Sequence, residues 1–505
     1  MKADRDESAG FRRVRLVAGQ VVRLRRQAWE RIVEHLAGER SGRKVASIES
    51  VRRVCVLASS SRGGTSVTAE MLQWQGADCD DAEGRLLTLP GEEKPHLILS
   101  GLAFPTRPER FDDLNVEDAG GSSVGSLLSE LSSEIGYPVS HCNDWRLYSL
   151  QLYRRLLLQW PLEMVELCQE PAIRSIADAL QRAFPVGYYD TPANRRWALA
   201  CCARCFPFIR SSFYDRSPLR DVRDVHLLDQ GAWSFEEPPF VFPPPWHNAT
   251  EAELERGTLL LRDPSNAWRL PFWRAVFSSQ DIRILHLVRD VAESLQGLCD
   301  GWNYRYGFQT IPSDVPLRIP GYTDDCTGSD VAWKQHRLNF SIDRQLSDRL
   351  LTDGMPLSLV VVCGHQWRGA HERILRDSEV LCLPRVQTRF SDLREEPLES
   401  FEDVCTALNL EVSRSGVDYA GTFSSRWVMT TVGAYEASHE RWRQSQYATE
   451  INRVAESHEF VELVRRLGLY RRPAGATAIA ARVPLIGREA ATPRYLAVTS
   501  VCENV

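Results

Sequence analysis

The sequence predicts an α/β protein whose three-layer, P-loop-like parallel sheet is flanked by helices and interrupted by a large, mostly helical insertion. An apolar strand at residues 54–58 leads into a loop of small residues and then a helix from Thr65. A second apolar strand, at residues 283–288, leads into Arg289-Asp290 and an amphipathic helix. Between these units, residues 105–250 show helical runs instead of strands. Strand–helix alternation is typical of a parallel sheet, so the region between reads as an insertion.

The loop after the first strand is suited to hold an anion. It reads SSSRGGTS, and its small residues let backbone N–H groups approach a phosphate at the start of the next helix. A Walker A motif is absent because no lysine precedes Thr65, and the cation is Arg62 instead. We therefore expect a ligand with a single 5′-phosphate-like group, held by Ser61, Arg62, Gly63, Gly64, Thr65 and Ser66.

The second strand–loop–helix unit predicts another phosphate site. Ligands of parallel α/β sheets bind outside the carboxyl ends of the strands, where Arg289 and Ser294 fall. An arginine offers a bidentate fork to phosphate, and a serine hydroxyl on the first helical turn adds a donor.

The remaining elements complete the predicted organisation. Further strands are expected at residues 258–262, 357–363 and 386–390, and the chain is expected to be mainly helical over residues 400–470. The insertion carries helical runs at residues 144–158, 162–168, 173–184 and 195–206. The predicted units are a basic helical segment (1–45), an α/β core (46–104 and 251–470), the insertion (105–250) and a peripheral tail (471–505). The insertion is expected to lie over the active-site mouth and to shape the acceptor pocket.

The basic segment contains an arginine-rich amphipathic pattern over residues 11–37, expected as one helix or as two helices broken at Gly19. Such a stretch suits peripheral contact with an anionic membrane surface. A helix packed on the core and a homodimer contact are the alternatives.

Composition narrows the class of protein further. The chain has 505 residues, 43% hydrophobic and 25% charged, with a net charge of −6, so no nucleic-acid partner is expected. No apolar run reaches the roughly 18–20 residues that span a bilayer, and the first ten residues lack the apolar segment of a secretion signal. The thirteen cysteines are scattered without a disulfide framework, which predicts a reducing, cytoplasmic location.

Four segments in order resemble the sulfotransferases that use 3′-phosphoadenosine 5′-phosphosulfate (PAPS). SSSRGGTS resembles their 5′-phosphosulfate loop, and LHLVRDVAES resembles their 3′-phosphate unit. Residues 258–272 (TLLLRDPSNAWRLPF) resemble the strand and Lys-Asp-Pro of the protein-tyrosine, Golgi-type and bacterial branches. RFSDL at residues 389–393, before an acidic helix at 400–408, resembles their Tyr-Glu-Asp-Leu region. The lack of an anchor at the N-terminus favours a bacterial-type enzyme.

The chain departs from the family pattern at three places. Arg62-Gly63-Gly64 stands where many members have Lys/Arg-Ser-Gly. The serine after Arg289 comes at the fifth position, whereas many members place it at the eighth, here Gly297. Arg262 replaces the usual lysine, which keeps the charge and changes the donor geometry.

The resemblance implies transfer of a sulfuryl group from PAPS to a hydroxyl, in preference to an amine, by in-line displacement without a metal and with PAP as product. By this resemblance, Arg62 and Arg262 are expected to stabilise the leaving oxygen. Arg289 and Ser294 are expected to bind the 3′-phosphate. For the base, the first candidate is Glu92, which follows a glycine past the phosphate loop; Glu93 and His96 are the other candidates.

The acceptor is expected to be a hydroxylated small molecule, lipid or glycan. Two other functions stay open from the residues alone, a P-loop-type nucleotide kinase or NTPase and a non-catalytic PAP-binding protein.

Overall fold

The protein is described here by a computed structural model. It describes residues 9–39, 47–77, 79, 83–103, 106, 113–214, 234–236, 240, 242–303, 310–312, 317–320, 322–323, 334, 337–339, 346, 350, 357–421, 428–430, 433–435 and 441–469. The expected tail at residues 471–505 lies outside the described residues.

The centre of the molecule is a five-stranded sheet in the order β11-β8-β1-β7-β2. All four strand pairs are parallel. The strands are β1 (Arg53–Ala58), β2 (Leu86–Leu87), β7 (Thr258–Arg262), β8 (Asp281–Val288) and β11 (Arg385–Arg389). Their buried residues are rich in leucine, valine and isoleucine, as expected for strands covered on both faces. The predicted α/β class is thus confirmed.

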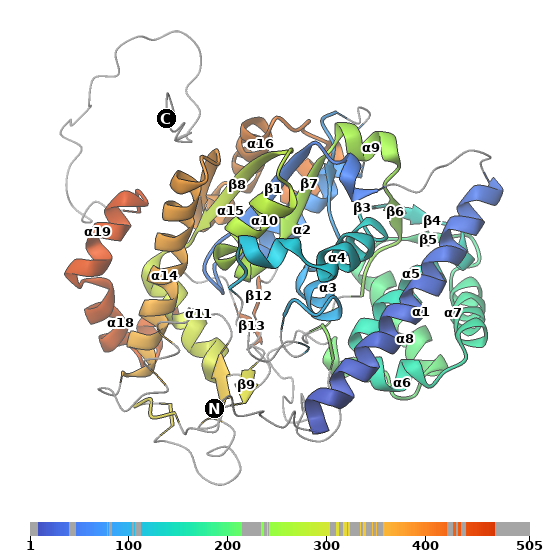
Figure 1. The fold of residues 1–505 in the computed structure, drawn as a ribbon, viewed down its shortest axis with the longest axis horizontal. Helices are drawn as coiled ribbons and strands as arrows, with labels where there is room; N and C mark the ends of the chain where they lie inside the picture. Colours follow the sequence, from blue (N-terminus) through green and yellow to red (C-terminus); the bar gives the residue numbers. More distant parts are fainter. Residues whose placement is uncertain are drawn as a thin grey trace.

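Helices cover both faces of this sheet, which gives three layers (Figure 1). Cys55 and Leu57 of β1 share a buried cluster with α2 (Thr65–Gln73) and α16 (Pro397–Leu408). Val54 and Val56 point to the other face and share a larger cluster with helices on that side. These include α10 (Leu270–Val276) and α14 (Leu359–Val380).

The predicted strand at residues 357–363 is instead the start of the 22-residue helix α14. Ser358 caps this helix by accepting a hydrogen bond from the Val361 N–H. The helix packs between the sheet and a peripheral cluster formed with α11 (Val291–Asn303), α18 (Ala448–Ala455) and α19 (His458–Arg466). A short apolar run does not distinguish a buried strand from a buried helix, and here the helix is the outcome.

The N-terminal segment is one continuous helix, α1 (Ala9–Glu39), and is not broken at Gly19. Val14, Val21 and Ile32 on one side of α1 are buried in the main core cluster. Figure 1 shows α1 running across α5 at the side of the molecule. The apolar side of α1 therefore packs on the protein itself, which leaves its polar side for other contacts.

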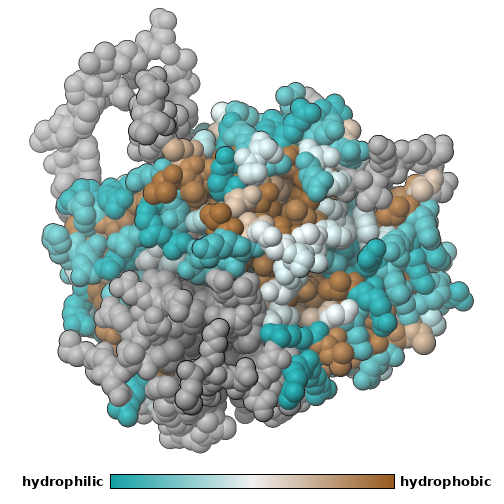
Figure 2. Space-filling model, in the orientation of Figure 1, coloured by the Kyte–Doolittle hydropathy of each residue, from teal (hydrophilic) through white to brown (hydrophobic). Residues whose placement is uncertain are grey.

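The region predicted as an insertion is helical and contains α4 (Ser122–Ser132), α5 (Trp145–Gln159), α6 (Pro161–Val165), α7 (Gln169–Ala183) and α8 (Pro192–Cys205). Its buried residues belong to the same cluster as α1 and one face of the sheet. Hydrophilic residues cover much of both ends of the face seen in Figure 2, with hydrophobic residues between them.

The other regular elements are short. They are α3 (Lys94–Leu99), α9 (Glu251–Arg256), α15 (Phe390–Glu395), α17 (Arg414–Gly421), the strand pairs β3–β6 (Gly136–Pro138, Trp246–Asn248), β4–β5 (His141–Cys142, Tyr188–Tyr189), β9–β10 (Thr310–Pro312, Arg337–Asn339) and β12–β13 (Val428–Thr430, Gly433–Tyr435), and the 3₁₀ turns Ile48–Ser50, Trp74–Gly76, Val116–Gly120, Ser211–Phe213, Pro264–Trp268 and Arg441–Gln444.

Candidate functional site

The loop between β1 and α2 lies at the point where the sheet order reverses, since β1 has β7 on one side and β8 on the other. Such switch points are where open α/β sheets bind ligands. The loop turns sharply because Arg62 and Gly64 both have positive φ, 64° and 100°. A side chain at Gly64 would place its Cβ 2.4 Å from the Phe390 ring, so only glycine fits there.

Two hydroxyls at the base of this loop lack partners. The side-chain oxygens of Ser59 and Ser60 are buried, and within the described structure neither has a hydrogen-bond partner. Buried polar groups are ordinarily satisfied, so these hydroxyls are available to a ligand. The predicted set began at Ser61, and the small-residue run that includes Ser59 and Ser60 was the signal for them.

Arg289 joins the two predicted phosphate motifs. Its Nη1 donates a hydrogen bond of 3.0 Å to the carbonyl oxygen of Arg62 in the loop. Gly297 also lies against this pair, since a Cβ there would be 3.2 Å from Arg62 Cβ and 3.8 Å from Arg289 Nη1. The eighth position after Arg289 therefore faces the loop, and glycine there allows Arg62 to pack closely against α11.

Ser294 has a more local contact. Its hydroxyl is fully buried and lies 3.4 Å from the carbonyl oxygen of Arg289, to which it donates. Serine hydroxyls in helices often donate in this way to a carbonyl of the preceding turn. A phosphate would have to compete with that carbonyl for the hydroxyl proton.

Arg394 and Glu293 lie beside Arg289 and belong to the same cluster of charged side chains. Neither residue was predicted as part of the site. Glu293 accepts from Arg289 Nε at 3.1 Å and lies 3.4 Å from both Nη atoms of Arg394. Both guanidiniums also lie over the Phe390 ring, at 5.2 and 5.9 Å from its centre. Arg394 directly follows the RFSDL segment, which was the available signal.

The two candidate carboxylates, Glu92 and Glu93, have different surroundings because adjacent side chains point in different directions. Glu92 is half-buried, and its Oε1 lies 3.3 Å from the hydroxyl of Ser66 at the start of α2, which donates to it. Glu93 is fully buried and accepts from the backbone N–H of Arg262. Burial, together with the charge of Asp263, raises the pKa of Glu93 to about 8.

Arg262 is at the end of β7, where it was predicted, and it is buried. Its Nε donates to the carbonyl of Gly91 at 3.0 Å and its Nη2 to the carbonyl of Leu89 at 3.1 Å. Burial lowers the pKa of this guanidinium, and the charge of Glu92 opposes that effect. Arg262 thus fixes the backbone segment that presents Glu92.

His96 belongs to another cluster. It is fully buried, with its Nε2 at 3.2 Å from Glu134 and its Nδ1 at 3.9 Å from Glu130. The same carboxylates pair with the buried Arg25 of α1. The structure therefore groups His96 with the contacts between α1 and the insertion.

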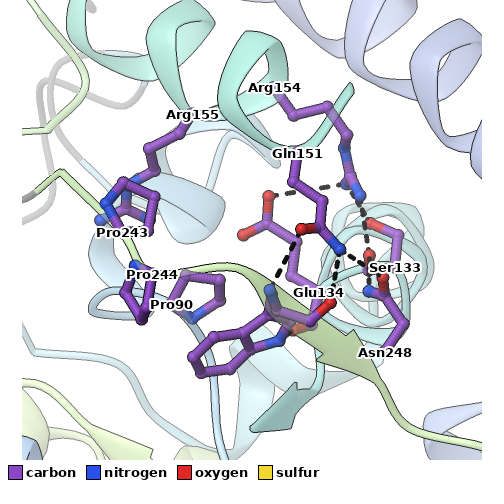
Figure 3. A pocket seen from close by; sticks show the side chains of 10 residues that line it. Pro90, Ser133, Glu134, Gln151, Arg154, Arg155, Pro243, Pro244 and Asn248 are labelled. Carbon is purple, nitrogen blue, oxygen red and sulfur yellow. Dashed lines mark hydrogen bonds and ion pairs between the residues drawn. The ribbon is translucent and has the colours of Figure 1, made fainter. Parts of the chain in front are cut away.

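A small cavity separates Glu92's loop from the insertion (Figure 3). Its volume is about 20 Å³, room for a water-sized group. It is lined by Pro90, Ser133, Glu134, Gln151, Arg154, Arg155, Pro243, Pro244, Trp246 and Asn248. The Arg155 guanidinium abuts Gly91, where an added Cβ would meet Nη2 at 1.9 Å. Arg155 also pairs with Glu236.

Comparisons with known proteins found structural likeness at low similarity only. No protein-family model and no curated protein matches the chain. The sulfotransferase domain from the curacin biosynthetic pathway aligns with a TM-score of 0.34 and 12% identity over 84% of this chain and 99% of that domain. The sulfotransferase domain from the Synechococcus PCC 7002 olefin synthase aligns with a TM-score of 0.33 and 12% identity over 84% and 96%. Scores this low carry no argument about activity, so function is argued from the residues.

Two features are absent from the described part of the chain. None of the helices described there combines the length and apolar character needed to cross a membrane. The same residues contain no group of three or more His, Cys, Asp or Glu side chains placed to hold a metal ion.

Proposed function

We propose that this protein transfers the sulfuryl group of PAPS to a hydroxyl group of an acceptor. The observation that carries the proposal is the hydrogen bond from Arg289 to the Arg62 carbonyl. It joins two anion-binding units at the carboxyl ends of the neighbouring strands β1 and β8. A ligand with two separate phosphate positions, as in PAPS, matches such a pair of units.

Charge and hydrogen-bond donors support an anionic ligand here. Three arginines, Arg62, Arg289 and Arg394, gather around the loop, and Glu293 is the carboxylate that pairs with two of them. The orphan hydroxyls of Ser59 and Ser60 and the N-terminus of α2 add neutral donors. The proposed ligand places its 5′-phosphosulfate in the loop and its 3′-phosphate beside Arg289.

In the proposed reaction the acceptor oxygen attacks sulfur in line with the bridging oxygen. The new O–S bond forms as the bond from sulfur to the bridging oxygen breaks, and the electron pair leaves with the 5′-phosphate of PAP. Glu92 receives the acceptor proton. Arg62 and the loop N–H groups stabilise the charge that develops on the leaving oxygen, the main task of a site for such displacements.

Arg262 contributes chiefly as a positioning residue in this proposal. Its guanidinium is bonded to the carbonyls of Leu89 and Gly91, so it fixes the loop that carries Glu92. The proposal calls for no metal because fixed arginines supply the positive charge.

The acceptor is proposed to approach between the Glu92 loop and the insertion. The small cavity beside Arg155 lies on that side, and Glu92 is a half-buried carboxylate that contacts Ser66 at the start of α2. We retain a hydroxylated small molecule, lipid or glycan as the acceptor class.

Calorimetric titration with PAP, AMP and ATP tests the nucleotide half of the proposal. We expect PAP to bind at least tenfold more tightly than AMP, and Arg289→Met to remove that preference, since AMP lacks the 3′-phosphate. Arg453→Met, at an exposed arginine of α18, is the control for loss of one charge. Equal affinities of the wild-type protein for PAP and AMP would contradict the proposal.

Transfer of ³⁵S from labelled PAPS to a panel of alcohols, phenols and sugars tests the catalytic half. Labelled product that depends on protein and acceptor separates an enzyme from a PAP-binding protein without activity. Magnesium-dependent hydrolysis of ATP, in place of sulfuryl transfer, would indicate a nucleotide kinase or NTPase.

A further inference from the structure

Glu293 occupies the space between two guanidiniums as an anionic ligand would. Its carboxylate is 3.1 Å from Arg289 Nε and 3.4 Å from each Nη atom of Arg394. All three side chains are largely buried, with exposures of 7% for Glu293, 25% for Arg289 and 10% for Arg394. A buried carboxylate is stable there because both arginines compensate its charge.

The same cluster is connected to the phosphate loop by Phe390. Both guanidiniums lie over its ring, and the ring edge presses on Gly64. Arg289 is in addition bonded to the Arg62 carbonyl. Arg394 is therefore part of the rigid surroundings of the loop, although it follows β11 at the sheet edge, far from Arg62 in sequence.

The two guanidiniums converge on one anion. Both contact the Glu293 carboxylate, and the charge of nearby Asp290 also acts on Arg289. Burial lowers the pKa of Arg289, so an additional anion beside it would offset a desolvation cost already present. A phosphate with three oxygens and close to two charges is a stronger partner for paired guanidiniums than a carboxylate.

We propose that Arg394 is a second guanidinium for the 3′-phosphate and that Glu293 is an internal anion which that phosphate displaces from the arginine pair. This rests on the proposed function, because it takes the ligand to be PAPS or PAP. Before binding, Glu293 keeps the two guanidiniums close together. On binding, the phosphate takes over their hydrogen bonds and the side chain of Glu293 turns away.

The experiment measures the affinity of the intact protein for PAP and for AMP in two variants. Arg394→Met is expected to weaken PAP binding at least tenfold and AMP binding less than twofold. Glu293→Gln is expected to tighten PAP binding severalfold, since a carboxamide competes less with the phosphate. Arg414→Met removes an arginine that is 90% exposed on α17 and also pairs at i,i+4, so it is the matched control.

The outcomes separate this inference from the proposed function. If the wild-type protein does not prefer PAP over AMP, the result contradicts both the proposed function and this inference. A wild-type preference for PAP that Arg394→Met leaves unchanged overturns the inference alone. If Glu293→Gln weakens PAP binding as much as Arg394→Met does, the phosphate does not displace Glu293. Glu293 would then hold the two arginines in place in the bound protein as well.

Folding of the variants is checked by thermal unfolding. Arg394→Lys gives a second reading if the methionine variant is unstable. It keeps the charge and loses the planar fork, so PAP affinity is expected between those of wild type and Arg394→Met. Wild-type affinity in Arg394→Lys, with normal folding, would contradict recognition by the guanidinium fork.

Discussion

Glu92 and Glu93 show how two adjacent carboxylates acquire different chemistry from their surroundings. Glu92 is half-buried and contacts the Ser66 hydroxyl of the phosphate loop. Glu93 is fully buried, accepts from the Arg262 N–H, and has a pKa raised to about 8 by desolvation. A proton acceptor must reach its substrate, so accessibility favours Glu92 and burial gives Glu93 a structural role.

We expect Glu92→Gln to retain PAP affinity within twofold and to lower sulfuryl transfer at least a hundredfold. A carboxamide keeps the size of the side chain and its contact with Ser66, but it does not accept the acceptor proton. Losses of about 10²–10⁴ are typical when a general base is removed. The measurement is PAP titration alongside turnover with labelled PAPS.

The neighbouring residue gives the control for this prediction. Glu93→Gln removes a carboxyl that is largely protonated near neutral pH, and we expect turnover within about threefold of wild type. If turnover survives Glu92→Gln but is lost in Glu93→Gln, then Glu93 is the proton acceptor and Glu92 has the structural role.

Among the secondary structure elements, β8 and α14 meet through a buried histidine pair. His286 of β8 and His371 of α14 are fully buried and lie 2.8 Å apart, Nε2 to Nδ1. Arg385 of β11 lies 3.1 Å from the other nitrogen of His286. Desolvation and then the neighbouring positive charge lower the pKa of His371 to about 3, and the pKa of His286 is lowered as well.

This pair makes the stability of the sheet edge dependent on pH. A histidine whose pKa is lower in the folded than in the unfolded protein is neutral when folded, so its contribution is complete above about pH 6.5 and falls toward pH 3. For His371 alone, the free energy of unfolding should be about 2 kcal/mol lower at pH 5 than at pH 7.5.

Urea unfolding at the two pH values measures this loss. His371→Gln is expected to flatten the difference between pH 7.5 and pH 5, because it removes one group that gains a proton on unfolding. His458→Gln, at an exposed position of α19, is the control and should keep the wild-type difference. An unchanged difference in the His371 variant would contradict this account.

The elements that sequence predicted well are those with strong local signals. β1, β7 and β8 are continuous apolar runs, and the start of α2 at Thr65 follows a loop of small residues. The run at 357–363 has the same apolar and β-branched character, yet it begins α14, because tertiary packing decided its conformation. Gly19 likewise does not interrupt α1, whose buried side is fixed by its neighbours.

The candidate site could be predicted only in part for a related reason. Arg262 ends β7, Arg289 directly follows β8 and Arg62 lies in the loop after β1, so the parallel sheet itself brings them to one edge. Glu293 and Arg394 meet through side chains from different segments, and no spacing in the sequence records that contact. His96 was a candidate because some members of the family that the chain resembles use a histidine as base, whereas its ring lies against Glu130 of α4 and Glu134.

At the scale of the whole molecule, α1 is joined to the insertion by a buried ion-pair network. Arg25 has no exposed surface and donates to Glu130, Glu134 and the carbonyl of Arg154. The arginines and carboxylates compensate one another in a dry environment, so each depends on the others.

We expect Arg25→Met to lower the free energy of unfolding by about 3–5 kcal/mol, because two carboxylates would stay buried without their main partner. Arg26→Met, one residue further along α1 at a side chain 77% exposed, should change it by less than about 0.5 kcal/mol. Urea unfolding of both variants at pH 7.5 gives the comparison. Similar small effects in the two variants would mean that α1 contributes little to the core.

The central position of β1 has a consequence for how the chain is made. Arg53 of β1 pairs with Thr258 of β7 and with Asp281 of β8, so both neighbours are synthesised long after it. At about 5–20 residues per second, a ribosome takes about 10–40 seconds to supply them. During that time an apolar strand with two open edges is exposed on the nascent chain. We expect biosynthesis of this protein to depend on chaperones that shield β1 until β7 and β8 have been synthesised.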